Sequence, residues 1–280
     1  MTAATLTVED VFIDGAVPAR LYRPADAAAG SRGIVWCHGG GFVHGDLDMP
    51  EADAVARRFA GAGHVVLSVD YRLVTAAGEN RFPAAHEDVL AAVAWMAAHA
   101  EEFGVDPAHL MLGGASAGGN VAAGVALRLA RESAAGAGGH APTPADLYLA
   151  YPVTHASLPS ASPQAASAVV KAPEGRRFRP SKVAAMNLHY VGDAAILADP
   201  YAFPGGHDLT GMPRTLIIDG DADDLRAMGE TFAAELEAAG VDVTYAVEPG
   251  TTHGHLNHPE LPYAERTLTT VLAWLAGETP

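Results

Sequence analysis

The amino-acid sequence predicts an α/β fold in which a mostly parallel central sheet carries helices on both faces. Two observations support this prediction. Short continuous apolar runs, such as 33–37 and 64–69, are typical of strands that are buried on both faces. Between such runs, segments such as 83–98 repeat apolar residues at helical spacing. Strands that alternate with helices are expected to pair in parallel, because each helix carries the chain back across the sheet.

The predicted strands are short apolar or alternating segments that end at glycine, proline or acidic turn residues. They are expected at 6–13, 19–22, 33–37, 64–69, 109–114, 147–150, 215–218 and 243–247. The first two are joined at Asp14-Gly15, a dipeptide that indicates a tight hairpin.

The predicted helices share apolar residues three and four positions apart. They are expected at 51–60, 83–98, 117–129, 181–190, 225–239 and 260–276. Residues 133–145 are low in complexity and rich in Gly and Ala, which predicts a surface loop.

The alternation of strands and helices stops between about residues 153 and 212. This segment is rich in Pro, Ser and Ala and contains a basic cluster, Arg176, Arg177 and Arg179. We interpret it as a cap insertion within a single domain over residues 1–280, because no repeat or linker divides the chain. For the basic cluster, a solvated face is favoured over a clamp for a substrate carboxylate.

Composition and charge exclude several classes of function. The chain has 280 residues, a net charge of −16 and one cysteine, Cys37. The negative charge argues against nucleic acid or an anionic membrane as a partner. No apolar run is long enough to span a bilayer, and the N-terminus lacks the pattern of a signal peptide. A single cysteine allows no internal disulfide, so we expect a cytoplasmic protein.

Chemistry in such a sheet is expected on the loops that follow the carboxyl ends of the strands. One of these loops reads G-A-S-A-G at 114–118, a G-x-S-x-G pattern between a strand and a helix. Small neighbours let strand and helix pass closely at a sharp turn that exposes Ser116. The helix points its positive end toward the serine oxygen, where negative charge develops in acyl transfer.

A second loop, H-G-G-G at 38–41, directly follows the buried strand at 33–37. Consecutive glycines let backbone N–H groups point into a cavity, as an oxyanion hole requires. His38 is interpreted as a support for this loop rather than as a proton shuttle. For His44, a place at the mouth of a pocket and a surface role are equally favoured.

Two more loops carry titratable residues. D-G-D-A-D-D at 219–224 suits either a divalent metal or the capping of the next helix together with one orienting acid. T-T-H-G-H at 251–255 follows the strand at 243–247. Serine, then aspartate, then histidine is the chain order of α/β-hydrolase triads.

Together these motifs resemble the hormone-sensitive-lipase-like family of bacterial carboxylesterases. The resemblance covers the chain from about residue 17 to its end. The matching pieces are H-G-G-G-F at 38–42, D-Y-R-L at 70–73, F-P-A with Asp88 at 82–88, G-x-S-A-G-G-N at 114–120, D-P-Y-A at 199–202, D-x-L-R-x-x-G-E at 223–230 and H-G at 253–254.

The resemblance implies an α/β-hydrolase fold and a set of site residues. Ser116 would be the nucleophile, Asp223 the acid and His253 the base. The oxyanion hole would be formed by backbone amides of Gly40, Gly41 and Ala117. Asp221 is the alternative acid and His255 the alternative base.

Three departures from the family pattern bear on the pocket. Ala115 stands where the family usually has Asp, and His255 stands where it usually has Phe. Many members also carry two N-terminal cap helices, whereas this chain begins close to the first strand. We therefore expect a less acidic and more accessible site around Ser116.

The resemblance implies a serine carboxylesterase that hydrolyses short-chain acyl esters through an acyl-enzyme, with no metal or cofactor. Its expected partner is a small-molecule ester, and a homodimer at the edge strand near the last helix is also considered. Amidase or deacetylase activity by the same triad is the closest alternative.

A zinc hydrolase and a ligand receptor have less support. T-H-G-H-L-N-H at 252–258 offers His253, His255 and His258 to a zinc ion, but Asn257 replaces the expected acid and no histidine follows. A non-catalytic receptor on this fold, as in plant gibberellin receptors, would lack the base, which is present here as His253.

Overall fold

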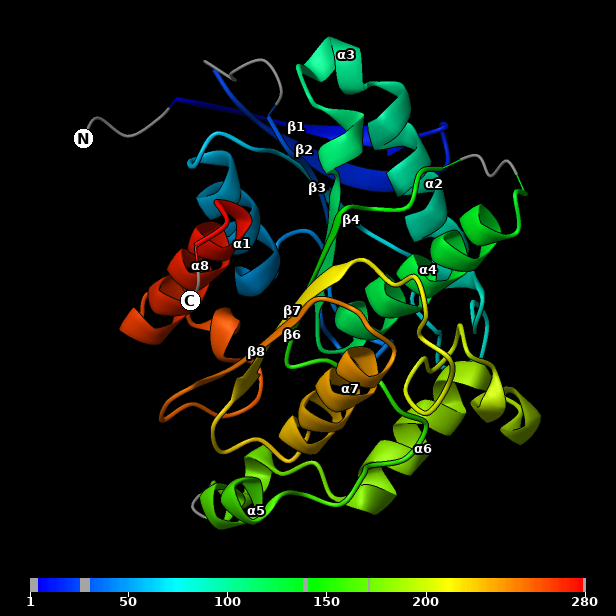
Figure 1. The fold of residues 1–280 in the computed structure, drawn as a ribbon, viewed down its shortest axis with the longest axis vertical. Helices are drawn as coiled ribbons and strands as arrows, with labels where there is room; N and C mark the ends of the chain where they lie inside the picture. The colour runs from blue at the N-terminus through cyan, green and yellow to red at the C-terminus, as the bar shows by residue number, and fades with distance from the viewer. Residues whose placement is uncertain (1–4, 26–30, 138–140, 171, 279–280) are drawn as a thin grey trace.

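The computed structural model describes residues 5–25, 31–137, 141–170 and 172–278 (Figure 1). An eight-stranded sheet runs through its centre in the order β1-β2-β4-β3-β5-β6-β7-β8. Neighbouring strands from β4 to β8 pair in parallel, and β2 is antiparallel to both β1 and β4. The mostly parallel sheet that the sequence predicts is therefore confirmed.

The strands lie close to their predicted positions. They are β1 (Leu6–Ile13), β2 (Val17–Pro24), β3 (Gly33–Cys37), β4 (Val65–Val69), β5 (Met111–Ala115), β6 (Asp146–Ala150), β7 (Arg214–Gly220) and β8 (Val243–Glu248). The β1–β2 hairpin turns at Asp14 and Gly15, which both have positive φ, at 49° and 75°. The amide of Ala16 donates to the carbonyl of Ile13 at 2.9 Å and closes this turn, and positive φ at both central residues is typical of the type I′ turns found in hairpins. Three residues, 14–16, separate the paired Ile13 and Val17.

The prediction that β5 begins at residue 109 is wrong. Residues Pro107–His109 form a short 3₁₀ helix, η1, and the strand begins only at Met111. The side chain of Asp106 accepts a hydrogen bond from the amide of Ala108 at 2.9 Å and so caps this turn.

Helices cover both faces of the sheet (Figure 1). On one face, α1 (Pro50–Ala60) and α8 (Pro262–Leu275) pack against a core that includes Ile34 and Trp36 of β3. On the other face, α2, α4 and α7 pack against a core that includes Val35 and Cys37. These three helices are α2 (Ala84–Ala98), α4 (Ala117–Ala134) and α7 (Arg226–Ala238), and the short α3 (Ala100–Phe103) follows α2. Successive β3 side chains thus enter opposite cores, which explains why the strand reads as one continuous apolar run.

Helix α4 is longer than predicted, because it continues past Leu129 to Ala134. Arg128, in the predicted part of the helix, and Glu132, in the extension, form an ion pair at 2.8 Å one turn apart, an arrangement that supports helical structure. The loop predicted at 133–145 therefore begins later, and its residues 138–140 lie outside the described part of the chain.

The segment between β6 and β7 contains only short helices among its described residues. These are α5 (Pro163–Val169), η2 (Glu174–Arg176), α6 (Pro180–Val191) and η3 (Ala194–Ala198). We call residues 153–212 the insertion. The predicted helix at 181–190 corresponds to α6, whereas α5 was not predicted. Ser162 caps α5 by accepting a hydrogen bond from the amide of Ala165 at 3.2 Å. Figure 1 shows α5 and α6 at the lower edge of the molecule, beyond the helices that cover the sheet.

The strand order places two of the predicted site loops side by side. β3 and β5 are neighbours, and Cys37 lies opposite Gly114 in their register. On one side of this pair the next strand of the sheet is β4, and on the other side β6, β7 and β8 follow in order. Where the direction of strand addition reverses in this way, the loops after the two strands open a crevice at the carboxyl edge of the sheet.

None of the helices described in the structure has the length and apolar character needed to cross a membrane.

Candidate active site

Ser116 lies on the sharp turn between β5 and α4. Its backbone has φ 53° and ψ −113°, a strained conformation for a residue with a side chain. The flanking glycines make this turn possible. A Cβ atom on Gly114 would lie 2.5 Å from the backbone of Gly118, and one on Gly118 would lie 2.2 Å from the carbonyl oxygen of Cys37. Strand, helix and the neighbouring β3 therefore approach as closely as the G-x-S-x-G pattern predicts.

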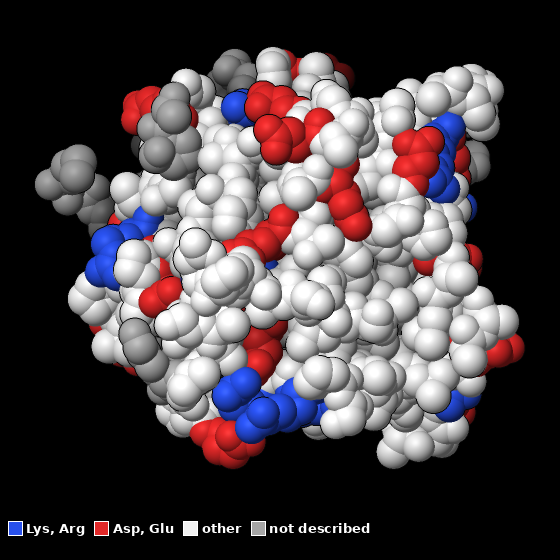
Figure 2. Space-filling view, turned by 60° about the horizontal axis from the view of Figure 1, so that its bottom comes forward, with Lys and Arg blue, Asp and Glu red and all other residues white. Residues whose placement is uncertain are grey.

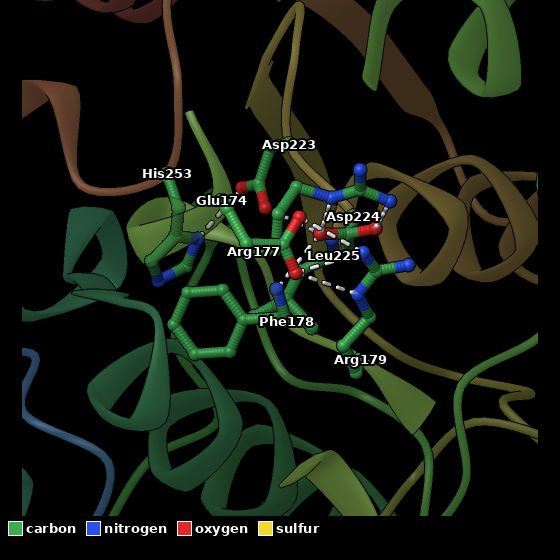
Figure 3. Close-up of polar contacts among 8 residues, drawn as sticks. All are labelled: Glu174, Arg177, Phe178, Arg179, Asp223, Asp224, Leu225 and His253. Carbon is green, nitrogen blue, oxygen red and sulfur yellow. Dashed lines mark hydrogen bonds and ion pairs between the residues drawn. The ribbon is translucent and has the colours of Figure 1, made fainter. Parts of the chain in front are cut away.

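Three of the predicted site residues form a continuous chain of hydrogen bonds. Ser116 Oγ lies 2.9 Å from Nε2 of His253, and Nδ1 of the same ring lies 2.6 Å from Oδ2 of Asp223. Figure 3 shows the ring of His253 facing the carboxylate of Asp223. The other oxygen of Asp223 accepts a hydrogen bond from the amide of Leu225 at 2.9 Å, which fixes the carboxylate plane. An Nδ1–H that donates to Asp223 leaves Nε2 free to accept the serine proton.

The glycine loop after β3 presents free backbone donors to the same place. Gly40 has φ 125°, and a Cβ atom there would lie 1.8 Å from the carbonyl oxygen of His44. In the described part of the chain, the amides of Gly40 and Gly41 donate to no backbone carbonyl. The amide of Ala117 is at the first position of α4, where helical amides have no intrahelical acceptor. These are the three donors expected for an oxyanion hole.

His38 supports this loop, as the sequence predicts. Its ring is fully buried and stacks on Tyr71 with ring centres 4.5 Å apart. The hydroxyl of Tyr71 donates to the carbonyl oxygen of His38 at 2.7 Å. Burial lowers the pKa of His38, against a smaller opposing effect of the Gly39 carbonyl. The ring therefore stays neutral and plays a structural part.

Sequence reasoning missed Glu51, a buried carboxylate beneath the glycine loop. It accepts hydrogen bonds from the indole of Trp36 at 2.7 Å and from the amide of Gly39 at 3.0 Å. Burial raises its pKa to about 7, although both hydrogen bonds act in the opposite direction. The absence of Asp at position 115 therefore does not leave the pocket without an acidic group. Only its helical spacing marked Glu51 in the sequence, and that pattern says nothing about a pocket.

A cavity of about 420 Å³ opens above Ser116 and His253. His44 lines it, which favours the first of the two places considered for that residue. The insertion supplies part of the wall. Its contributions are Phe178, Lys182 and Met186.

The insertion is tied to the loop that carries Asp223 (Figure 3). The guanidinium of Arg177 donates to both oxygens of Asp224 at 2.8 and 2.9 Å. The amide of Phe178 donates to the same carboxylate at 2.7 Å. These contacts hold the ring of Phe178 edge-to-face against His253, with ring centres 4.6 Å apart.

A model of the alpha/beta hydrolase fold family matches residues 34–257. The chain belongs to this family. Within it, the chain is one of the hormone-sensitive-lipase-like hydrolases that the motifs indicate.

Curated relatives of this hydrolase act on carboxylic esters. It is 37% identical to the carboxylesterase NlhH of Mycobacterium tuberculosis over 244 residues, which cover 86% of this chain and 72% of the relative. It is 35% identical to the ethyl acetate hydrolase of Pseudomonas putida over 244 residues, covering 85% of this chain and 70% of the relative. The chain is a carboxylic ester hydrolase.

Solved structures agree with this assignment. The carboxylesterase EstE1, cloned from a metagenomic library, superposes with a TM-score of 0.82 at 30% identity, covering 99% of this chain and 90% of the other. An esterase of Pyrobaculum calidifontis gives a TM-score of 0.80 at 33% identity, covering 96% of this chain and 85% of the other.

In this hydrolase the alternative acid and base lie elsewhere. Asp221 contacts Arg226 at 3.2 Å rather than a histidine. His255 is buried, and its Nε2 lies 3.0 Å from the hydroxyl of Thr267. Burial, and to a lesser degree His253, lowers the pKa of His255 to about 3. His255 is therefore a neutral core residue.

The three histidines considered as zinc ligands have different partners. His253 contacts Ser116 and Asp223, His255 contacts Thr267, and His258 lies 3.5 Å from Glu260. Among the described residues, no group of three or more His, Cys, Asp or Glu side chains is placed to hold a metal ion.

The prediction of a solvated basic face is correct for Arg179 but wrong for Arg177. The side chain of Arg179 is 54% exposed and pairs with the exposed Glu174 at 2.8 Å. Arg177 is only 15% exposed, because it is enclosed in its pair with Asp224. Neither arginine lines the cavity, so the geometry does not favour the substrate clamp.

Proposed function

We propose that this hydrolase is a serine carboxylesterase that cleaves short-chain acyl esters through an acyl-enzyme. The observation that supports the proposal is the hydrogen-bonded series Ser116, His253 and Asp223, of which Ser116 and His253 line the cavity and Asp223 is buried behind the ring. Each of these side chains follows a different strand of one parallel sheet, so the three reach the same edge from rigid positions.

In the proposed mechanism, His253 takes the proton of Ser116 while the serine oxygen attacks the ester carbonyl. The protonated ring then gives this proton to the leaving alcohol, and the carbonyl carbon remains bonded to Ser116. A water molecule, deprotonated by the same ring, then attacks the carbonyl carbon of the acyl-enzyme. The bond from this carbon to the serine oxygen breaks, the ring returns the proton to Ser116, and the carboxylic acid is released. Asp223 keeps the imidazole in the required tautomer and stabilises its charged form.

The amides of Gly40, Gly41 and Ala117 are proposed to bind the oxygen that becomes negative during each attack. Donors of this kind need no rearrangement as the charge develops. The fixed loop geometry supports this role, because Gly40 is packed against His44 and Gly39 donates to Glu51 instead.

The preference for short acyl chains is argued from the size of the cavity. A volume of about 420 Å³ lies near the small end of ligand pockets. We propose that the insertion forms a cap over it within a single domain spanning residues 1–280. The similarity to an ethyl acetate hydrolase agrees with a small substrate.

The test is a series of p-nitrophenyl esters from acetate to dodecanoate, run beside p-nitroacetanilide. We expect kcat/KM to be highest for the short esters and the amide to be a poor substrate. Ser116→Ala should remove turnover, whereas Ser133→Ala, an exposed serine at the other end of the same helix, should leave it unchanged. Ester turnover by Ser116→Ala at the wild-type rate would refute the mechanism.

We also propose that two copies associate through β8. In the described structure this strand pairs only with β7, so its other edge is unpaired. Unpaired strand edges are templates for association. Size-exclusion chromatography with light scattering measures the molar mass of the protein in solution. A monomer at all concentrations would refute this part of the proposal.

A further inference from the structure

Lys182 is a basic side chain of the active-site cavity that has no acidic partner among the described residues. It projects from α6 and lines the same cavity as Ser116 and His253. Its ammonium lies 4.4 Å from the centre of the Phe178 ring, a cation–π contact that leaves the charge available to a second ligand.

Two arginines of the same insertion are paired with acidic residues, in contrast to Lys182. Arg177 is held by Asp224 and Arg179 by Glu174. Most basic side chains on the face drawn in Figure 2 also lie against acidic ones. Lys182 itself is exposed, so its ammonium lies at the rim of the cavity rather than at its floor. The chain as a whole carries a net charge of −16, so an uncompensated cation at this rim is not explained by bulk composition.

The position of this cation relative to the reacting groups is set by a fixed aromatic ring. Phe178 is held by Asp224 through its backbone amide and contacts His253 with ring centres 4.6 Å apart. The two distances, added, place the Lys182 nitrogen no more than about 9 Å from the centre of the His253 ring. A carboxylate a few carbons from an ester carbonyl at Ser116 covers a distance of that order.

The other charged group that lines the cavity is Glu51, which is fully buried. Its oxygens are engaged by Trp36 and Gly39. Its negative charge, where present, disfavours an anion at the floor of the cavity and leaves the rim at Lys182 as the favourable place for one.

We propose that Lys182 makes this site selective for esters that carry a carboxylate, such as monoesters of dicarboxylic acids. The inference rests on the proposed serine esterase activity and names the substrate class of that site. The carboxylate is bound at the rim by the ammonium while the ester carbonyl lies at Ser116.

The experiment compares monoethyl glutarate with ethyl pentanoate, which share the leaving alcohol and the acyl chain length. Hydrolysis is followed by pH-stat titration in wild type, Lys182→Met, Lys182→Arg and Arg179→Met. Arg179→Met is the matched control, because it removes one positive charge from the same insertion without touching the cavity.

We expect Lys182→Met to lower the ratio of kcat/KM for glutarate over pentanoate by roughly threefold to tenfold, mainly through KM. Lys182→Arg should keep most of the ratio, and Arg179→Met should keep all of it. Raising the salt concentration should shrink the ratio in wild type and leave it nearly unchanged in Lys182→Met.

A second pair, 3-butyryloxypropanoate and propyl butyrate, shares the acyl group and the number of alcohol carbons and places the carboxylate on the alcohol side. If only the first ratio depends on Lys182, the acyl side of the ester faces the rim. If only the second ratio depends on it, the alcohol side does. The proposal is wrong if Lys182→Met leaves the ratios of both substrate pairs unchanged. It is also wrong if Lys182→Met and Arg179→Met change the ratios by the same amount. Failure of wild type to hydrolyse even ethyl pentanoate would instead refute the proposed esterase activity.

Discussion

Arg177 in the insertion donates two hydrogen bonds, of 2.8 and 2.9 Å, to the carboxylate of Asp224. Asp224 directly follows Asp223 in the chain. The insertion is thereby fastened to the loop that carries the proposed acid. Phe178, next in the chain, reaches the ring of His253 as a result. The Arg177–Asp224 contact therefore positions a wall residue of the cavity, Phe178, against the proposed base.

We expect Arg177→Met to lower the free energy of unfolding by about 1–3 kcal/mol, because Asp224 would keep a mostly buried charge with one amide as its remaining partner. kcat for a neutral ester should fall as well, since Phe178 would no longer be fixed against His253. Chemical denaturation and steady-state kinetics measure the two effects.

Arg179→Met serves as the control for this change. Its pair with Glu174 is exposed, at 54% and 75% for the two side chains. Loss of such a surface pair is expected to cost less than about 0.5 kcal/mol. Equal effects of the two substitutions on stability and on kcat would contradict the role given to the Arg177–Asp224 contact.

The contribution of Arg177 should also depend on pH. Burial tends to raise the pKa of Asp224, but hydrogen bonds from Arg177 and from the Phe178 amide outweigh it and hold the pKa below its usual 3.8. A carboxyl group with a lowered pKa stabilises the fold above its unfolded pKa, and this stabilisation is lost as the pH falls below 3.8. The stability gap between wild type and Arg177→Met should therefore be constant near neutral pH and shrink in acid.

Glu51→Gln tests the buried carboxylate under the glycine loop. Burial raises the pKa of Glu51 from 4.5 to about 7, so the folded state holds a proton that the unfolded state releases. Wild-type stability should therefore fall as the pH rises from 4.5 to 7. Glutamine does not titrate, and its stability curve should lack this fall. Parallel curves for the two proteins over that range would contradict the assignment.

The same substitution should slow catalysis. Glutamine has one acceptor oxygen, so either the amide of Gly39 or the indole of Trp36 loses its partner. The glycine loop would shift away from the serine, and kcat should fall more than KM changes. Glu102→Gln, an exposed residue of α3, is a control that should alter neither property.

Gly40→Ala tests the loop as an oxyanion hole. The added Cβ would lie 1.8 Å from the carbonyl oxygen of His44, which forces the loop to move. Loss of one oxyanion donor typically costs roughly two to three powers of ten in kcat. Gly63→Ala has a similarly positive φ of 99° but nothing within 4 Å, so it should keep wild-type kcat even if it lowers stability.

The sequence predicted the part of the site that depends on local pattern and strand order. Ser116, Asp223 and His253 each follow an apolar strand, and parallel strands end at one edge, so their convergence follows from topology. The glycine loop at 38–41 was predicted because it also directly follows an apolar strand. The structure places it beside the serine loop, since Cys37 and Gly114 are partners in the register of β3 and β5.

The rest of the site depends on contacts between segments that no local pattern relates. Glu51 lies in α1, and only the packing of that helix brings its carboxylate to Gly39. Arg177 and Asp224 are separated by 47 positions along the chain, and their charges alone do not identify them as partners. Lys182 becomes notable only once the cavity that it lines is known.

The central claim is that Ser116 becomes covalently acylated, and a trapping experiment tests it most directly. The enzyme is inactivated with paraoxon, digested with trypsin and analysed by mass spectrometry. Cleavage after Arg81 and Arg128 releases a peptide in which Ser116 is the only Ser, Thr or Tyr. One diethylphosphoryl group on this peptide, appearing in step with loss of esterase activity and absent from Ser116→Ala, is the predicted result. Complete inactivation with this peptide unmodified would contradict the account.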